Sequence, residues 1–105
     1  MKKVALITGS SRGMGKAEAF EFASCGYDVI VHYVKNKDKA EEVRKGILGK
    51  YPVDVLVVQA DLSKEEDIRR LVKTSYDRFH HIDALVNNAG IAPYGPISGK
   101  TITGF

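Results

Sequence analysis

The sequence predicts a doubly wound α/β fold, in which helices cover both faces of a parallel β-sheet. Short apolar runs alternate with segments whose apolar residues recur at helical spacing. Glycine-containing turns follow the first and the fourth of these runs, at residues 9–15 and 87–90. Because strands and helices alternate, the crossovers should be right-handed and the strands parallel. In the doubly wound arrangement, four such strands have the order 3-2-1-4.

The first strand is expected at residues 4–7, a continuous apolar run typical of a strand buried on both faces. A helix should follow from about Gly13 to Cys25, and Gly26 stands where a C-terminal cap belongs. Residues 28–33 predict the second strand, which completes a strand–helix–strand unit.

The second helix can be capped by Asn36 or Asp38, and it should end at Gly49. Its apolar residues recur at helical spacing. The valine-rich residues 53–58 predict the third strand. Residues 63–66, Ser-Lys-Glu-Glu, form a capping box, which predicts the start of the third helix.

The fourth strand is expected at residues 83–87, and residues 101–105 fit the first turn of a further helix. In a larger sheet of this kind another strand lies beside the fourth, and we find no candidate for it in these residues. We therefore expect an exposed edge at the fourth strand. Because an exposed edge invites pairing with another chain, we predict self-association through it, or a marginally stable fold.

The composition indicates one small domain and excludes several classes of protein. The apolar fraction of 44% and the charged fraction of 28% are ordinary for a soluble globular protein. A net charge of +3, without a run of like charges, does not indicate nucleic acid binding. Cys25 is the single cysteine, which excludes an intrachain disulfide and a cysteine-cluster metal site. No apolar run is long enough for a signal peptide or a membrane span, so we expect a cytoplasmic protein.

Residues 9–15, Gly-Ser-Ser-Arg-Gly-Met-Gly, carry the clearest functional signal. They follow a strand and open a helix, whose first N–H groups are unpaired and whose dipole favours an anion. Glycines let a pyrophosphate approach the backbone closely. Ligands bind where the strand order reverses, between the first and fourth strands, and the turn at residues 87–90 lies at the same place. The plain alternative is an ordinary strand-to-helix turn.

The end of the second strand indicates which dinucleotide binds. An acidic residue often binds the ribose hydroxyls there, but residues 32–35 are His-Tyr-Val-Lys. No carboxylate would repel a 2′-phosphate, and Lys35 and Arg12 are placed to pair with one. These residues favour NADP(H) over NAD(H) as the cofactor. The alternative is that Lys35 and Lys37 are surface lysines beside a loop.

Three polar residues that follow strands have two interpretations each. Asp61, after the third strand, can accept a hydrogen bond from the adenine amino group or help to cap the next helix. Asn87 and Asn88 can contact the cofactor, or they can fix the end of the fourth strand through hydrogen bonds to neighbouring backbone. Both interpretations stay open for each residue.

Three motifs together resemble the short-chain dehydrogenase/reductase family. Residues 8–15, Asp61-Leu62 and residues 87–90 are similar to its TGxxxGxG, Asp-Val/Leu and NNAG motifs, in order and at the family's spacing. The resemblance runs from Val4 to about Pro96. It implies a Rossmann-type fold, a dinucleotide cofactor and oxidoreductase chemistry on a carbonyl substrate.

The resemblance also implies which residues contact which part of the cofactor. Residues 9–15 would hold the pyrophosphate, and residues 33–35 would lie near the 2′-phosphate. Asp61-Leu62 would lie at the adenine, and residues 88–90 along the ribose of the nicotinamide half. The Ser-Ser-Arg insert and residues 33–35 resemble the NADPH-dependent branch, especially bacterial 3-oxoacyl-(acyl-carrier-protein) reductases. The implied cofactor-binding residues are Gly9, Ser10, Ser11, Arg12, Gly13, Met14, Gly15, Tyr33, Lys35, Asp61, Leu62, Asn88, Ala89 and Gly90.

The family's catalytic set is an Asn, a Ser and a Tyr-x-x-x-Lys pair, and its expected positions lie beyond residue 105. Tyr33 and Lys37 have the Tyr-x-x-x-Lys spacing, but they straddle a strand end and a loop, so we interpret the match as chance. Tyr94 and Ser98 are interpreted as loop residues. We therefore predict no catalytic and no metal-binding residue in this chain.

Three interpretations of the whole chain remain. In the first, residues 1–105 are one NAD(P)-binding domain, the N-terminal part of an NADP(H)-dependent carbonyl reductase, and inactive alone. In the second, the chain is a stand-alone nucleotide-binding or interaction module without catalysis. In the third, a second polypeptide supplies the catalytic half.

Overall fold

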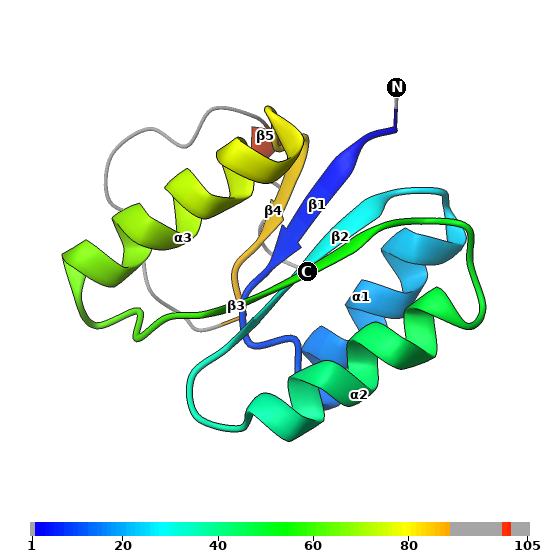
Figure 1. Cartoon of the computed structure of the whole chain (residues 1–105), viewed down its shortest axis with the longest axis horizontal. Helices are drawn as coiled ribbons and strands as arrows, with labels where there is room; N and C mark the ends of the chain where they lie inside the picture. Colours follow the sequence, from blue (N-terminus) through cyan, green and yellow to red (C-terminus); the bar gives the residue numbers. More distant parts are fainter. Residues whose placement is uncertain (1, 89–99, 102–105) are drawn as a thin grey trace.

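The computed structural model describes residues 2–88 and 100–101, and the structural statements below concern these residues. Three helices and five strands alternate along the chain until β5, which follows β4 without an intervening described helix (Figure 1). The elements are β1 (Val4–Ile7), α1 (Gly13–Ser24), β2 (Asp28–Tyr33), α2 (Lys37–Leu48), β3 (Val55–Gln59), α3 (Glu65–Phe79), β4 (Ala84–Val86) and β5 (Lys100–Thr101).

The strands form one parallel sheet with the order β3-β2-β1-β4-β5. The register places Leu6 of the central strand β1 opposite Ile30 of β2 and Leu85 of β4. The predicted order 3-2-1-4 is confirmed. The order reverses beside β1, so the carboxyl ends of β1 and β4 border the crevice in which ligands of such sheets bind.

β5 is the element that the sequence did not predict. It pairs with β4 in parallel, with Lys100 opposite Ala84 and Thr101 opposite Leu85. The predicted exposed edge at β4 is therefore wrong, because a further strand occupies it, and the structure does not support self-association through that edge. The helical turn expected at residues 101–105 is also wrong at Thr101, and residues 102–105 lie outside the described residues.

Helices cover both faces of the sheet, as predicted: α1 and α2 lie on one face and α3 on the other (Figure 1). Alternate residues of β1 point to opposite faces, since Ala5 and Ile7 pack with the α1–α2 side while Val4 and Leu6 pack with the α3 side. All four are at most 1% exposed. This burial explains why the first strand is continuously apolar.

The helix ends agree with the sequence at two positions and differ at a third. Asn36 caps α2, since its Oδ1 accepts from the N–H of Lys39 at 3.1 Å. α1 is followed by the exposed Cys25 and by Gly26, whose φ of 88° suits glycine.

The predicted capping box at residues 63–66 is wrong. α3 begins at Glu65 after Lys64, and no side chain of the described residues caps it. Instead, the hydroxyl and the N–H of Ser63 both donate to Oδ1 of Asp61, at 2.7 and 3.0 Å, so Ser63 belongs to the turn that precedes the helix.

Two negative findings concern the described part of the chain alone. None of its helices is long and apolar enough to cross a membrane. Within residues 2–88 and 100–101, no group of three or more His, Cys, Asp or Glu residues is placed to hold a metal ion.

Candidate cofactor-binding site

The turn between β1 and α1 is fixed by the end of β2. The N–H of Gly9 donates to Nδ1 of His32 at 2.9 Å, and the N–H of Ser10 donates to the backbone oxygen of His32 at 3.0 Å. The Ser10 hydroxyl donates to the backbone oxygen of Ile7 at 2.7 Å and accepts from the N–H of His32 at 3.0 Å. Gly9 has a φ of 61°, which favours glycine. The shape of the turn is therefore set by hydrogen bonds within the protein.

The N-terminus of α1 is suited to an anion. Its capping residue, Arg12, is extended with a φ of −161°, and no side chain of the described residues caps the helix. The first turn of α1 holds no acidic residue, whereas α2 has Asp38 and α3 has residues 65–67, Glu-Glu-Asp. The unpaired N–H groups and the positive end of the helix dipole favour a phosphate here.

Two glycines keep this end of the helix accessible and close to the turn. A Cβ at Gly15 would lie 2.1 Å from the backbone oxygen of Gly9, so a side chain there would push the helix and the turn apart. Gly13 has a φ of 61°, and a Cβ built there would meet no atom within 4 Å. This backbone cradle fits a pyrophosphate, which needs close approach to N–H groups.

A cleft of about 500 Å³ lies between this turn and the end of β2. Three cationic side chains line it: Arg12 from the turn, Lys35 after β2 and Lys39 from the first turn of α2. No carboxylate is among the described residues that line the cleft, which are Gly9, Ser11, Arg12, Tyr33, Val34, Lys35, Asn36 and Lys39. Such a cleft favours a multiply charged anion over a neutral sugar.

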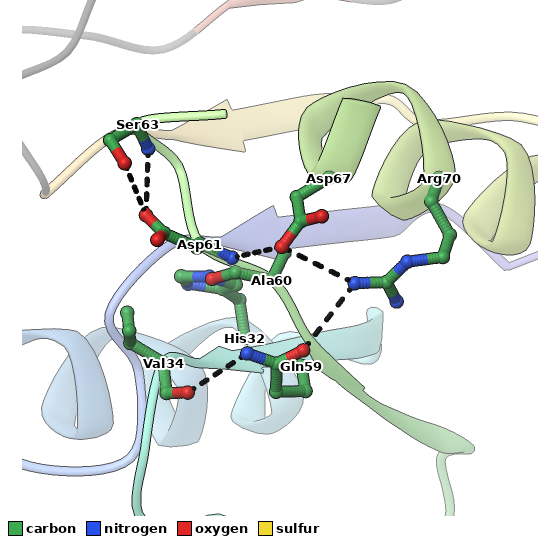
Figure 2. A network of polar contacts seen from close by, with 8 residues as sticks. All are labelled: His32, Val34, Gln59, Ala60, Asp61, Ser63, Asp67 and Arg70. Carbon is green, nitrogen blue, oxygen red and sulfur yellow. Dashed lines mark hydrogen bonds and ion pairs between the residues drawn. The ribbon is translucent and has the colours of Figure 1, made fainter. Parts of the chain in front are cut away.

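Asp61 lies at the start of the loop from β3 to α3 (Figure 2). Its Oδ1 accepts from the N–H of Ser63 at 3.0 Å and from the Ser63 hydroxyl at 2.7 Å, and these bonds lower the pKa of Asp61. Its own N–H donates to Oδ2 of Asp67 at 2.8 Å. Asp61 thus shapes the turn before α3, while its contact with an adenine stays a prediction.

The same polar network reaches the cleft (Figure 2). Arg70 lies 3.6 Å from Asp67 and donates to Oε1 of Gln59 at 3.4 Å. Nε2 of Gln59 donates to the backbone oxygen of Val34, a cleft residue, at 3.0 Å. The network joins α3, β3 and the end of β2.

Asn88 joins the end of β4 to β1 and α1. Its N–H donates to Oγ1 of Thr8 at 2.8 Å, and its Nδ2 donates to the backbone oxygen of Thr8 at 3.1 Å and to Oε1 of Glu18 at 2.7 Å. Oδ1 of Asn87 accepts from the Thr8 hydroxyl at 3.2 Å. Both asparagines therefore fix the strand ends, and their contact with the cofactor stays a prediction.

The predicted site residues are divided between the cleft and other places. Ser10 and Leu62 have buried side chains, Ser10 within the turn and Leu62 in the core beneath α3. Met14, at the start of α1, is 67% exposed. Ala89 and Gly90 lie outside the described residues. The predicted residues that line the cleft are Gly9, Ser11, Arg12, Tyr33 and Lys35.

Three residues of this region were not predicted from the sequence to belong to the site. Lys39 lines the cleft and Lys37 is not among the described lining residues, because the third position of α2 faces the turn. The cap at Asn36 could have indicated the place of Lys39. It puts the first turn of α2 directly after β2, at the carboxyl edge of the sheet. Asn36 was considered as a cap alone, and it also lines the cleft. His32 was treated as part of a strand, although a polar residue in a buried strand calls for hydrogen-bond partners.

A doubly wound parallel sheet with a glycine turn, an uncapped helix start and a cationic cleft at its carboxyl edge defines a Rossmann-type nucleotide-binding protein. The model of the short chain dehydrogenase family matches residues 3–103. The chain therefore belongs to the short-chain dehydrogenase family of oxidoreductases.

Relatives in sequence support the same assignment. The 3-oxoacyl-(acyl-carrier-protein) reductase FabG of Staphylococcus epidermidis is 43% identical over 91 residues, which cover 87% of this chain and 37% of that protein. A 3-oxoacyl-(acyl-carrier-protein) reductase of Synechocystis is 42% identical over 89 residues, or 85% of this chain and 36% of that protein. The chain spans little more than a third of these relatives.

Solved structures agree with the fold. An alcohol dehydrogenase of the archaeon Thermococcus sibiricus, complexed with 5-hydroxy-NADP, has a TM-score of 0.77 and 32% identity, covering 82% of this chain and 36% of that one. A short-chain dehydrogenase/reductase of Serratia marcescens has a TM-score of 0.80 and 34% identity, covering 89% of this chain and 38% of that one.

Proposed function

We propose that this chain binds NADP(H) and forms the cofactor-binding part of a carbonyl reductase that acts on 3-oxoacyl thioesters. The observation that carries the cofactor preference is the cleft, in which Arg12, Lys35 and Lys39 gather and no described lining residue is acidic. The nicotinamide supplies the hydride chemistry when bound. The residues of this chain bind and orient the dinucleotide.

Each part of the site has a proposed task. The N–H groups at the start of α1 hold the pyrophosphate, with Gly13 and Gly15 allowing its approach. Arg12 and Lys39 reach the 2′-phosphate from the turn and from α2, the two sides of the cleft. The relatives support the substrate class, since both are 3-oxoacyl-(acyl-carrier-protein) reductases by name. The neighbour complexed with 5-hydroxy-NADP supports the cofactor class.

A titration tests the cofactor preference. We expect NADPH to bind the chain more tightly than NADH by calorimetry, because NADPH adds a phosphate that meets three cations. Lys39→Ala should weaken NADPH binding about tenfold, which corresponds to one charge-assisted hydrogen bond, and leave the affinity for NADH unchanged. Lys37→Ala, two residues away and not among the lining residues, is the matched control and should change neither. Equal or tighter binding of NADH would contradict the proposal.

We also propose that these 105 residues bind the cofactor without turning it over. The proton-transfer residues of the family, a Ser and a Tyr-x-x-x-Lys pair, are expected at positions beyond residue 105 and are therefore not among these residues. The purified chain should leave NADPH absorbance constant in the presence of an acetoacetyl thioester. Steady oxidation of NADPH that depends on the thioester would refute this part of the proposal.

A further inference from the structure

His32 is a buried imidazole with two hydrogen bonds, one to each of two neighbouring segments. The side chain is 1% exposed and lies near the end of β2. Its Nδ1 accepts from the N–H of Gly9 at 2.9 Å, and its Nε2 lies 2.8 Å from the backbone oxygen of Ala60. Figure 2 shows the ring beside Ala60, immediately before Asp61. One side chain therefore joins the phosphate-binding turn to the end of β3.

The partners fix the protonation state of the ring. A backbone N–H can donate and a backbone oxygen can accept, so Nδ1 must be without a proton and Nε2 must carry one. A second proton on Nδ1 would face the N–H of Gly9 and remove the acceptor. The bonds that shape the turn at Gly9 thus require a neutral imidazole.

Among the described residues, Nδ1 of His32 is the one side-chain acceptor for the Gly9 N–H, and Gly9 packs against Gly15 at the start of α1. A Cβ at Gly15 would lie 2.1 Å from the Gly9 oxygen, so a shift of Gly9 moves the backbone next to the cradle. The His32 ring is therefore linked to the start of α1 by one hydrogen bond, to Gly9, and by one backbone contact, between Gly9 and Gly15.

We propose that His32 is a positioning residue, whose neutral imidazole holds the phosphate-binding turn at Gly9 in the shape that a dinucleotide requires. This inference rests on the proposed binding of NADP(H). His32 does not line the cleft among the described residues, so it acts through Gly9 and not by touching the cofactor.

The charge state of the ring follows from its surroundings. Burial lowers the pKa of His32, and the hydrogen bond to Ala60 opposes this in part. Arg12 lies in the turn that His32 contacts, Lys35 follows β2, and Asp61 follows Ala60 and donates its N–H to Asp67, but the lowered pKa comes from burial and not from these charges. The ring is thus neutral at neutral pH, and the Gly9 bond is lost only as acidification protonates it.

Two substitutions separate the two bonds of the ring. Asn carries its amide oxygen near the place of Nδ1, so His32→Asn can keep the bond from Gly9 without a titrating group. Gln carries its amide nitrogen near the place of Nε2, so His32→Gln can keep the bond to Ala60 and lose the other. His80→Asn is the matched control: His80 is exposed with a φ of 71°, a conformation that Asn tolerates.

The experiment measures NADPH affinity of all four proteins in a series from about pH 7.5 to well below the ordinary histidine pKa of about 6.5, because burial lowers the pKa of His32. At the higher pH, His32→Asn should bind within about threefold of the wild type and His32→Gln about tenfold more weakly, the worth of one hydrogen bond. On acidification, the wild type and His80→Asn should lose affinity relative to His32→Asn. At each pH, the affinity of each protein is divided by that of His32→Asn. Protonation of the cofactor's own phosphate affects both affinities alike and cancels in this ratio.

Two further measurements keep the outcomes distinct. Circular dichroism must show that each variant folds, and the amide resonance of Gly9 in the ligand-free wild type should shift as His32 titrates. His32→Gln binding as tightly as the wild type, or a Gly9 resonance that stays unchanged while the ring resonances of His32 titrate, overturns the role of His32. Absence of NADPH binding by the wild type, with the Gly9 shift present, overturns the proposed function instead.

Discussion

Gly15 has no room for a side chain, and its neighbours are backbone atoms that cannot rotate away. A Cβ there would lie 2.1 Å from the Gly9 oxygen and 2.9 Å from Cα of Ser10. We expect Gly15→Ala to destabilise the fold by about 1–3 kcal/mol through overpacking and to weaken dinucleotide binding.

Gly13→Asn is the control for that substitution. Gly13 also starts α1, but its Cβ would meet open space, and Asn tolerates its positive φ. This variant should cost less than about 1 kcal/mol in a urea titration. Equal losses in the two variants would show that the close approach at Gly15 does not matter.

Asp61 owes its lowered pKa first to the hydroxyl of Ser63 and next to the N–H of the same residue. A lowered folded-state pKa stabilises the fold above the ordinary value of 3.8, and this contribution is lost as the pH falls through the folded value. Ser63→Ala should raise the pKa of Asp61, measured by NMR titration of its carboxyl carbon. Ser24→Ala, which removes a hydroxyl bonded to the backbone oxygen of Glu21, should leave it unchanged.

Single residues were predicted best where the backbone conformation requires a particular residue type. Gly9 and Gly13 were found from sequence because a tight turn before a helix requires glycine, and both have a φ of 61°. Lys39 and His32 were missed for different reasons. A surface lysine carries no signal of where its helix points, and the partners of a buried histidine belong to segments distant in sequence.

At the scale of elements, α2 both closes the cleft and depends on one cap. Asn36 accepts from the N–H of Lys39 and lines the cleft. Asn36→Ala should lower the free energy of unfolding by about 1 kcal/mol, because it removes this cap. Asn36→Asp should keep the free energy of unfolding, since Asp caps helices well. It should weaken NADPH binding, because it adds a negative charge to the cleft.

Thermal unfolding and calorimetric titration of these two variants check that separation. The stability loss should appear in Asn36→Ala alone, and Asn36→Asp should weaken NADPH more than NADH. An Asn36→Asp variant that binds NADPH like the wild type would place the 2′-phosphate away from α2.

Elements with a clear pattern of apolar residues could be predicted from the sequence, and very short elements could not. β1 and β2 were found because both faces of each strand are buried, which makes β1 continuously apolar and gives β2 the apolar run Val29–Val31. β5 has two residues, too few to show a period, and its pairing with β4 is a long-range contact. The start of α3 was misplaced because Ser63 belongs to a turn closed by Asp61, a contact that a local capping pattern does not include.

At the scale of the whole molecule, the net charge of +3 and the three cations of the cleft act together on an anionic ligand. Raising the salt concentration from about 0.05 M to about 0.5 M should weaken NADPH binding, because ions screen these charges. NADH, with fewer charges, should weaken less. Isothermal titration at several salt concentrations measures both, and equal slopes for the two dinucleotides would argue against a cationic 2′-phosphate site.

α1 has the phosphate-binding turn at one end and Cys25 at the other. Its 12 residues, at about 1.5 Å each, separate the two by about 18 Å. Cys25 is exposed, and the chain has one cysteine. A thiol-reactive dye would therefore attach at a single known place outside the cleft. Energy transfer from reduced nicotinamide to that dye would make the protein an optical sensor of its own ligand.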